Sequence, residues 1–100
     1  MGWADNYIAS LKSGNHVVFR PRGNSMTGKI SSGQQVTLAP VCDSTQLSKG
    51  DVVMCKVHGK QFLHLITSVK HDSYQISNNH GHVNGWTKRD SIYGVLIQVE

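Results

Sequence analysis

Two residues of this chain have the side chains that hydrolyse acyl bonds. Ser25 lies in the stretch GNSM, residues 23–26, just ahead of a series of strand-like segments. A serine hydroxyl is a weak nucleophile at neutral pH, so a base must take its proton as it attacks a carbonyl carbon. His64 lies in the apolar stretch FLHLI, residues 62–66, and an imidazole with an ordinary pKa of about 6.5 suits that task. The pair indicates acyl transfer with Ser25 as nucleophile and His64 as general base.

Each of these residues also has a purely structural explanation. Ser25 could cap a helical turn that begins at Met26, because serine is a preferred residue at helix N-termini. His64 could be a hydrogen-bonded histidine of the core, because strand alternation places apolar neighbours on both faces of residues 62–66. Both alternatives stay open when the residues are considered one at a time.

The segments that would position these side chains are mostly strands. Apolar residues recur at helical spacing from Trp3 to Ser13, and Gly14 follows where a helix would end. From residue 16 the pattern is β-branched and alternating, with glycines between the runs. The predicted strands are residues 16–20, 35–40, 51–57, 61–69, 74–77 and 91–99. This order predicts a mainly β chain with one short N-terminal helix.

Two connections between these segments carry structural predictions. The stretch His58–Gly59–Lys60 joins two strand-like runs, and its glycine can take the positive φ of a tight hairpin. Residues 78–87 are rich in Asn, Gly and His and are predicted to form one long loop. Long loops in small domains are often functional, so this loop is a candidate part of a site.

Composition limits the number of domains and the compartment. One hundred residues with 38% apolar content suffice for one domain, residues 1–100, with a helix in 1–14 and a β core in 16–99. The longest apolar run, residues 52–55, is far shorter than the roughly 20 residues that cross a bilayer. Cys42 and Cys55 form no CxxC pair, which favours reduced thiols, although a single disulfide stays open. We expect a soluble, cytoplasmic protein without a membrane partner.

Several blocks together resemble a known family. The blocks are GNSM at 23–26, GDVV at 50–53, HLI at 64–66 and SNN at 77–79. Their order and spacing over roughly residues 16–99 are similar to the catalytic core of signal peptidases and LexA-type self-cleaving repressors, without the membrane anchor or DNA-binding domain. The resemblance implies a serine protease with a bent β-sheet that forms a partly closed barrel. It implies Ser25 as nucleophile and His64 as base, as in the Ser-His branch of the signal peptidases.

The resemblance also assigns roles to neighbouring residues. The position of the family's aspartate is occupied by Asn78, which could orient the imidazole through its side-chain carbonyl but carries no charge to offset imidazolium. Asp72 or Asp90 could take that role if the fold brings either one close. In the family the nucleophile's N–H stabilises the oxyanion. Around it we expect Gly23, Asn24 and Met26 to line the site, with Gly23 permitting an unusual backbone conformation.

The expected partner is a peptide or protein bound in extended form, since this family presents its substrate by strand addition. No cofactor is expected. The pair His80 and His82 is weak grounds for zinc, because it lacks a second spaced pair of ligands, so no metal is predicted. The net charge of +4 comes from dispersed residues, which argues against nucleic acid as the partner. The sequence leaves the oligomeric state open.

Two alternatives to a peptidase remain. The same fold with Asn78 in place of the acid could serve as an inactive peptide-binding or protein-binding module. A small β domain that binds nucleic acid is favoured only by the calculated pI of about 9.3, and its affinity would fall steeply with salt.

Overall fold

The computed structural model describes residues 2–100 and arranges all of their strands in a single antiparallel sheet. Its elements are α1 (Asp5–Lys12), β1 (Val17–Phe19), β2 (Val36–Pro40), β3 (Val52–Val57), β4 (Lys60–Lys70), β5 (Ser73–Ser77), β6 (Val83–Lys88), the 3₁₀ turn η1 (Arg89–Ser91) and β7 (Ile92–Val99). The sheet has seven strands in the order β1-β2-β7-β3-β4-β5-β6. The prediction of a mainly β chain with one short helix is confirmed, and the sheet stays open, with β1 and β6 at its edges.

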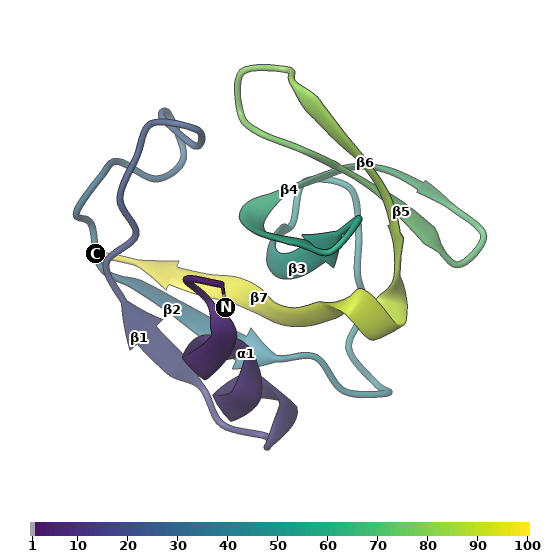
Figure 1. Cartoon of the computed structure of the whole chain (residues 1–100), viewed down its shortest axis with the longest axis horizontal. Coiled ribbons are helices and arrows are strands. Elements are labelled where there is room, and N and C mark those ends of the chain that lie inside the picture. The colour runs from purple at the N-terminus through teal and green to yellow at the C-terminus, as the bar shows by residue number, and fades with distance from the viewer. Residues whose placement is uncertain (1) are drawn as a thin grey trace.

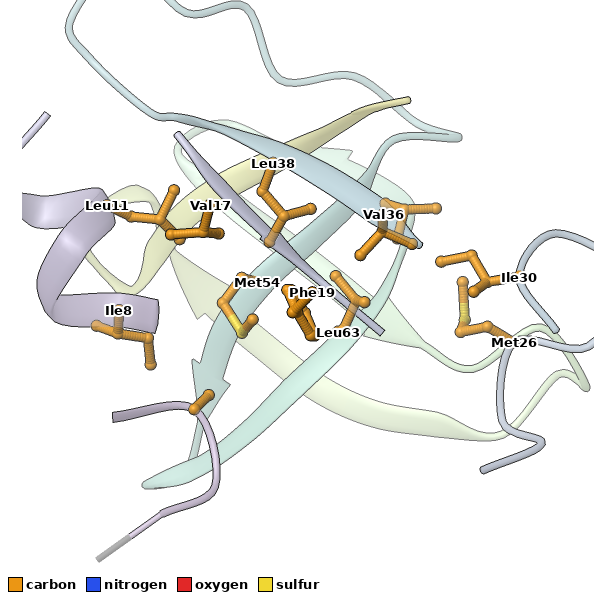
Figure 2. Packing of buried hydrophobic residues seen from close by; sticks show 12 residues of the cluster. Ile8, Leu11, Val17, Phe19, Met26, Ile30, Val36, Leu38, Met54 and Leu63 are labelled. Atoms are coloured by element: carbon orange, nitrogen blue, oxygen red, sulfur yellow. The ribbon is translucent and has the colours of Figure 1, made fainter. Parts of the chain in front are cut away.

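The sheet buries both faces at its centre. Residues of β3 alternate between two apolar clusters, because successive side chains of a strand point to opposite faces: Val52 and Met54 belong to one, Val53 and Cys55 to the other. Figure 2 shows the first cluster, in which Leu38, Met54, Phe19 and Leu63 come from four strands. Each such fully buried side chain contributes about 1.5–3 kcal/mol to folding, so the central strands give the site a firm support.

Helix α1 covers one face of the sheet, where it contacts β1, β2 and β7, and it lies in front of β2 in Figure 1. Its Ile8 and Leu11 are buried in the first cluster. Leu11 packs so closely on β7 that a Cβ at Gly94 would come within 2.7 Å of a Leu11 methyl carbon. Within residues 2–100, no helix is long and apolar enough to cross a membrane.

The hairpin between β3 and β4 turns at His58 and Gly59, whose φ angles are 51° and 81°. Val57 pairs directly with Lys60, so the predicted hairpin is confirmed, with Lys60 already in the strand. Two positive φ angles in succession are typical of a type I′ turn, which matches the right-handed twist of the strands.

One structural prediction is wrong. Residues 78–87 do not form one long loop, because Val83–Lys88 is the strand β6, paired with β5. The Asn, Gly and His content of the segment is atypical of strands, but pairing with β5 outweighs this weak local preference at a sheet edge. The remaining loop is residues 78–82, and it lies against the turn that carries Ser25.

Candidate active site

Ser25 lies on a short turn that buried side chains anchor to the core. Gly23 has a φ of 110°, which any other residue would adopt only with strain, and it redirects the chain after β1. The Ile30 N–H donates to the Met26 carbonyl at 2.8 Å, which closes a helical turn. Met26 and Ile30 are each only 4% exposed, and Figure 2 shows both reaching from this segment toward the core. The buried pair fixes the turn and leaves Ser25 at the surface.

Loop 78–82 holds this turn from the other side. The Asn79 N–H donates to the Ser25 carbonyl at 2.8 Å. The Asn79 side-chain Nδ2 donates to the Thr27 carbonyl at 2.8 Å, and the His80 Nε2 donates to the Asn24 carbonyl at 2.6 Å. Three bonds from two consecutive residues thus fix three carbonyls around the serine, and they limit how far its hydroxyl can move.

His64 brings both ring nitrogens into hydrogen-bond contact. His64 lies in β4 opposite Val53. The residue is only 8% exposed, and its ring stacks on Phe62. Nε2 is 3.2 Å from the Ser25 Oγ, and Nδ1 is 2.7 Å from the Asn84 Oδ1. An amide oxygen only accepts, so Nδ1 carries the proton and the lone pair of Nε2 faces the serine hydroxyl. This is the tautomer that a general base for Ser25 requires.

These contacts bear on whether Ser25 is a helix cap and His64 a core histidine, or whether the two form a pair. The Ser25 hydroxyl bonds to His64 rather than capping a backbone N–H of its own turn. His64 is buried and doubly bonded, as a core histidine would be, but one of its partners is the hydroxyl of the exposed Ser25. The structure therefore brings Ser25 and His64 together across 39 residues of sequence.

The residue that orients His64 is Asn84, which corrects the prediction of Asn78. The Asn78 Oδ1 instead accepts the N–H groups of His80 and His82, at 2.8 and 3.0 Å, and shapes loop 78–82. The two alternative carboxylates also lie elsewhere. Asp72 forms an exposed ion pair with Lys88, and Asp90 lines a separate pocket beside α1.

Asn84 reaches the ring because of an irregularity in β6. Val83 pairs with Ser77 and Gly85 with Ile76, so Asn84 lies between two paired residues as a β-bulge. A bulge re-aims the side chain of its extra residue and is frequent beside active sites. The only signal in the sequence is Gly85, since an isolated glycine inside a strand indicates a bulge. That signal was hidden because the segment was predicted to be a loop.

Burial sets the charge of the candidate base. Desolvation lowers the pKa of His64 below its usual 6.5, the bond to Asn84 raises it in part, and the electrostatic interaction with the His82 side chain lowers it further. Loss of solvent disfavours the charged imidazolium, which is the physical cause of the main effect. His64 is therefore neutral at pH 7 and able to accept a proton.

A cavity of about 200 Å³ opens beside the pair. Ser25 and His64 line it together with Gly23 and Met26, as predicted for the latter two. Asn24 does not line it and contributes instead the carbonyl that His80 holds. The Gly23 N–H donates to the Ser32 hydroxyl at 3.2 Å, whereas the Ser25 N–H has no acceptor within residues 2–100. The Ser25 N–H is thus a main-chain donor that the described residues leave without an acceptor.

The histidines of the neighbouring loop do not assemble a metal site. Among residues 2–100, no three His, Cys, Asp or Glu side chains lie together as metal ligands would. The His80 ring is already bonded to a main-chain carbonyl, so its position is explained without a metal.

The geometry supplies a nucleophile, a neutral base in the right tautomer, an orienting amide and a free main-chain donor beside a cavity. These are the parts that acyl transfer needs. Comparison with known proteins finds no family model and no curated protein that matches this chain.

Proposed function

We propose that this chain is a serine endopeptidase of the signal peptidase and LexA-like type, in which Ser25 attacks the peptide bond and His64 is the general base. The observation that carries the proposal is the continuous contact from Ser25 through His64 to Asn84 at the mouth of a cavity. The order of the GNSM, GDVV and HLI blocks, which resembles that family, also supports it.

The proposed reaction has two stages. The Ser25 Oγ attacks the peptide carbonyl carbon while its proton passes to the His64 Nε2, and the Ser25 N–H donates to the oxyanion. The C–N bond then breaks, His64 gives its proton to the leaving amine, and an ester remains on Ser25. In the second stage His64 takes one proton from water, and the hydroxide attacks the ester. The C–O bond to Ser25 then breaks, His64 returns its proton to the Ser25 Oγ, and the new carboxylic acid leaves and gives its remaining proton to water.

Strand β1 offers a place for an extended peptide. It pairs on one side with β2 and is an edge of the sheet, so its other side has unpaired backbone groups along Val17–Phe19. A peptide added as a further strand would gain main-chain hydrogen bonds there. The chain runs directly from β1 into the turn of Gly23 and Ser25, so such a peptide would lead toward the nucleophile.

The test is cleavage of a diverse mixture of peptides, read by mass spectrometry, with the wild-type protein and three variants. Ser25→Ala and His64→Ala should each abolish the cuts. Ser31→Ala is the matched control, because Ser31 lines the same cavity and the ring of His64 is hydrogen-bonded to Ser25 and Asn84, not to Ser31. Cuts that persist in Ser25→Ala, or an intact mixture with folded wild-type protein, would refute the proposal.

A second candidate function is a peptide-binding module without catalysis. The observation that favours it is the neutral partner of His64, because an amide cannot offset imidazolium charge as a carboxylate does. Within residues 2–100, no carboxylate is bonded to the ring. For this candidate the same peptide mixture should bind the wild-type protein and Ser25→Ala equally well, and neither should cut it.

A further inference from the structure

A second cavity adjoins the cavity at Ser25. This neighbouring cavity of about 400 Å³ shares Trp3, Pro21 and Arg22 with the first and runs toward Tyr7 and Phe19. Tyr7 and Phe19 stack with ring centroids 4.3 Å apart, and Trp3 packs against both rings. Trp3 is nonetheless 55% exposed. The two cavities adjoin at the shared residues, and together we call them the groove: Ser25 lines one part of it, and the aromatic side chains of Trp3, Tyr7 and Phe19 line the other.

The charge of this groove has one sign. Arg22 is the one charged residue that lines the cavity at Ser25, and the second cavity adds Arg20. None of the six acidic residues of the chain lines either cavity. The nearby Asp5 lines a different pocket, and its carboxylate is bonded to Gln61 and the Gly2 N–H. The electrostatic potential along the groove is therefore positive.

Of the two arginines, Arg22 is free for a ligand. The Arg20 guanidinium donates to the Gly33 carbonyl at 2.9 Å. In the described part of the chain, the exposed Arg22 side chain makes neither an ion pair nor a hydrogen bond. A guanidinium binds carboxylates well because its N–H groups match both oxygens.

We propose that this groove selects extended peptides that place an acidic side chain against Arg22 and an apolar or aromatic side chain on the wall of Trp3, Tyr7 and Phe19. This binding preference would define the substrates of the proposed peptidase. It rests on the proposed function only for the position at which a bound peptide is cut. Charge complementarity with Arg22 and the apolar wall together favour a peptide of mixed character. A polyphosphate chain would leave the aromatic wall uncovered.

The first test measures binding, which does not depend on catalysis. Immobilised Ser25→Ala protein is exposed to two pools of end-blocked decapeptides, random except for a Phe and, two residues away, either Glu or Gln. Retention of the Glu pool should exceed that of the Gln pool by about threefold, as for an exposed ion pair, and the excess should shrink at high salt. End-blocking restricts the acid to the side chain.

Variants of Arg22, made in the same Ser25→Ala protein, test the assignment. Arg22→Gln should remove the preference for Glu, and Arg22→Glu should turn it into a preference for a third pool with Lys at that position. Lys49→Glu is the control for net charge, because Lys49 is exposed and lines neither cavity; it should keep the preference for Glu. Equal retention of the Glu and Gln pools, or a preference that survives Arg22→Gln, would overturn the inference.

A cleavage arm separates this inference from the proposed function. The same pools are incubated with the wild-type protein and read by mass spectrometry. Preferential retention of the Glu pool without any cleavage would refute the peptidase proposal but support the groove assignment. Cleavage together with equal retention of the Glu and Gln pools would support the peptidase proposal but refute the groove assignment. Displacement of the Glu pool by a single-stranded oligonucleotide at equal concentration would overturn the choice of a peptide as the ligand.

Discussion

The Nδ1 of His64 lies 2.7 Å from the Oδ1 of Asn84. The contact joins the middle of β4 to a residue that stands out of register in β6, on the far side of β5. It has two consequences: the imidazole is held in one tautomer, and within residues 2–100 no bonded carboxylate would balance the imidazolium of the proposed reaction. Asn84 is a positioning residue that a single substitution can convert into a charged one.

Asn84→Asp should increase the activity. A carboxylate at this position strengthens the bond to the imidazolium, since a charge-assisted hydrogen bond is roughly twice as strong as a neutral one. We expect kcat to rise by about tenfold, which corresponds to about 1.4 kcal/mol, and the acidic limb of the pH profile to move to higher pH. Asn84→Ala is the control and should lower kcat, because the ring loses its orientation. Steady-state kinetics between pH 4 and 9 measure both; lower activity in Asn84→Asp would contradict the role assigned to Asn84.

The activity should depend on the protonation of His64. Burial lowers the pKa of this imidazole below 6.5, and only the neutral ring accepts a proton from Ser25. We expect kcat/KM to rise with pH through a midpoint below 6.5 and to be constant above it, since this ratio reports the pKa of the free enzyme. A midpoint above 6.5 would show that a neighbouring charge outweighs desolvation.

The same shift predicts how stability depends on pH. The pKa of His64 is lower in the folded chain than the unfolded value of 6.5, so between the two values the unfolded chain binds more protons. The contribution to the free energy of unfolding is therefore fully present above pH 6.5 and is lost as pH falls through the folded pKa. Urea unfolding across this window measures the slope for the wild-type protein and for His64→Gln. A slope that is equal in the two proteins would contradict burial of a neutral His64.

The elements that could be predicted from the sequence are those with local patterns. Helix α1 and the strands β3 and β4 follow from apolar spacing, and the turn at Gly59 from its tolerance of positive φ. Strand β6 could not be found in this way, because an edge strand of Asn, Gly and polar residues is stabilised by its pairing with β5. Asn84 was missed for the same reason, since a bulge exists only relative to a partner strand.

The pairing of Ser25 with His64 was predicted from the order of sequence blocks and not from a local pattern. No local pattern relates Ser25 to His64, which are 39 residues apart, and strand alternation alone favours a core histidine in β4. The order of blocks that resembles a protease family linked the two residues. The same resemblance pointed to Asn78, which precedes β6, instead of Asn84 within it. Block order thus located the two side chains of the candidate pair but not the amide that orients the ring.

The two cysteines should react at very different rates. Hydrogen bonds from Ser44 and Thr45 lower the pKa of the exposed Cys42 to about 7, and burial raises the pKa of Cys55 to about 12. Because the thiolate is the nucleophile, iodoacetamide at pH 7.5 should modify Cys42 at least about a hundredfold faster than Cys55. Peptide mass spectrometry measures both rates. Ser44→Ala should slow the reaction of Cys42, and fast labelling of Cys55 in the folded protein would contradict its burial in the core.

The contacts between loop 78–82 and the Ser25 turn should be needed for catalysis more than for folding. The His80 Nε2 donates to the Asn24 carbonyl at 2.6 Å, next to the nucleophile and away from the cavity. His80→Ala removes this donor, and because the site is exposed we expect a stability loss of about 1 kcal/mol. The serine can then leave hydrogen-bond distance of His64, so kcat should fall by about tenfold or more while KM changes little.

His80→Gln distinguishes this positioning role from a general effect on the loop. Glutamine places its amide Nε2 donor near the position of the imidazole Nε2, so it should restore most of the lost kcat. Lys29→Ala is the control on the same turn, because Lys29 is exposed and its side chain makes no ion pair or hydrogen bond within residues 2–100; its kinetics should match the wild type. Thermal unfolding of all three variants accompanies the kinetics. If His80→Ala and His80→Gln lose activity equally while remaining folded, the bond to Asn24 does not position Ser25, and the side chain of Asn79 becomes the one that holds the turn.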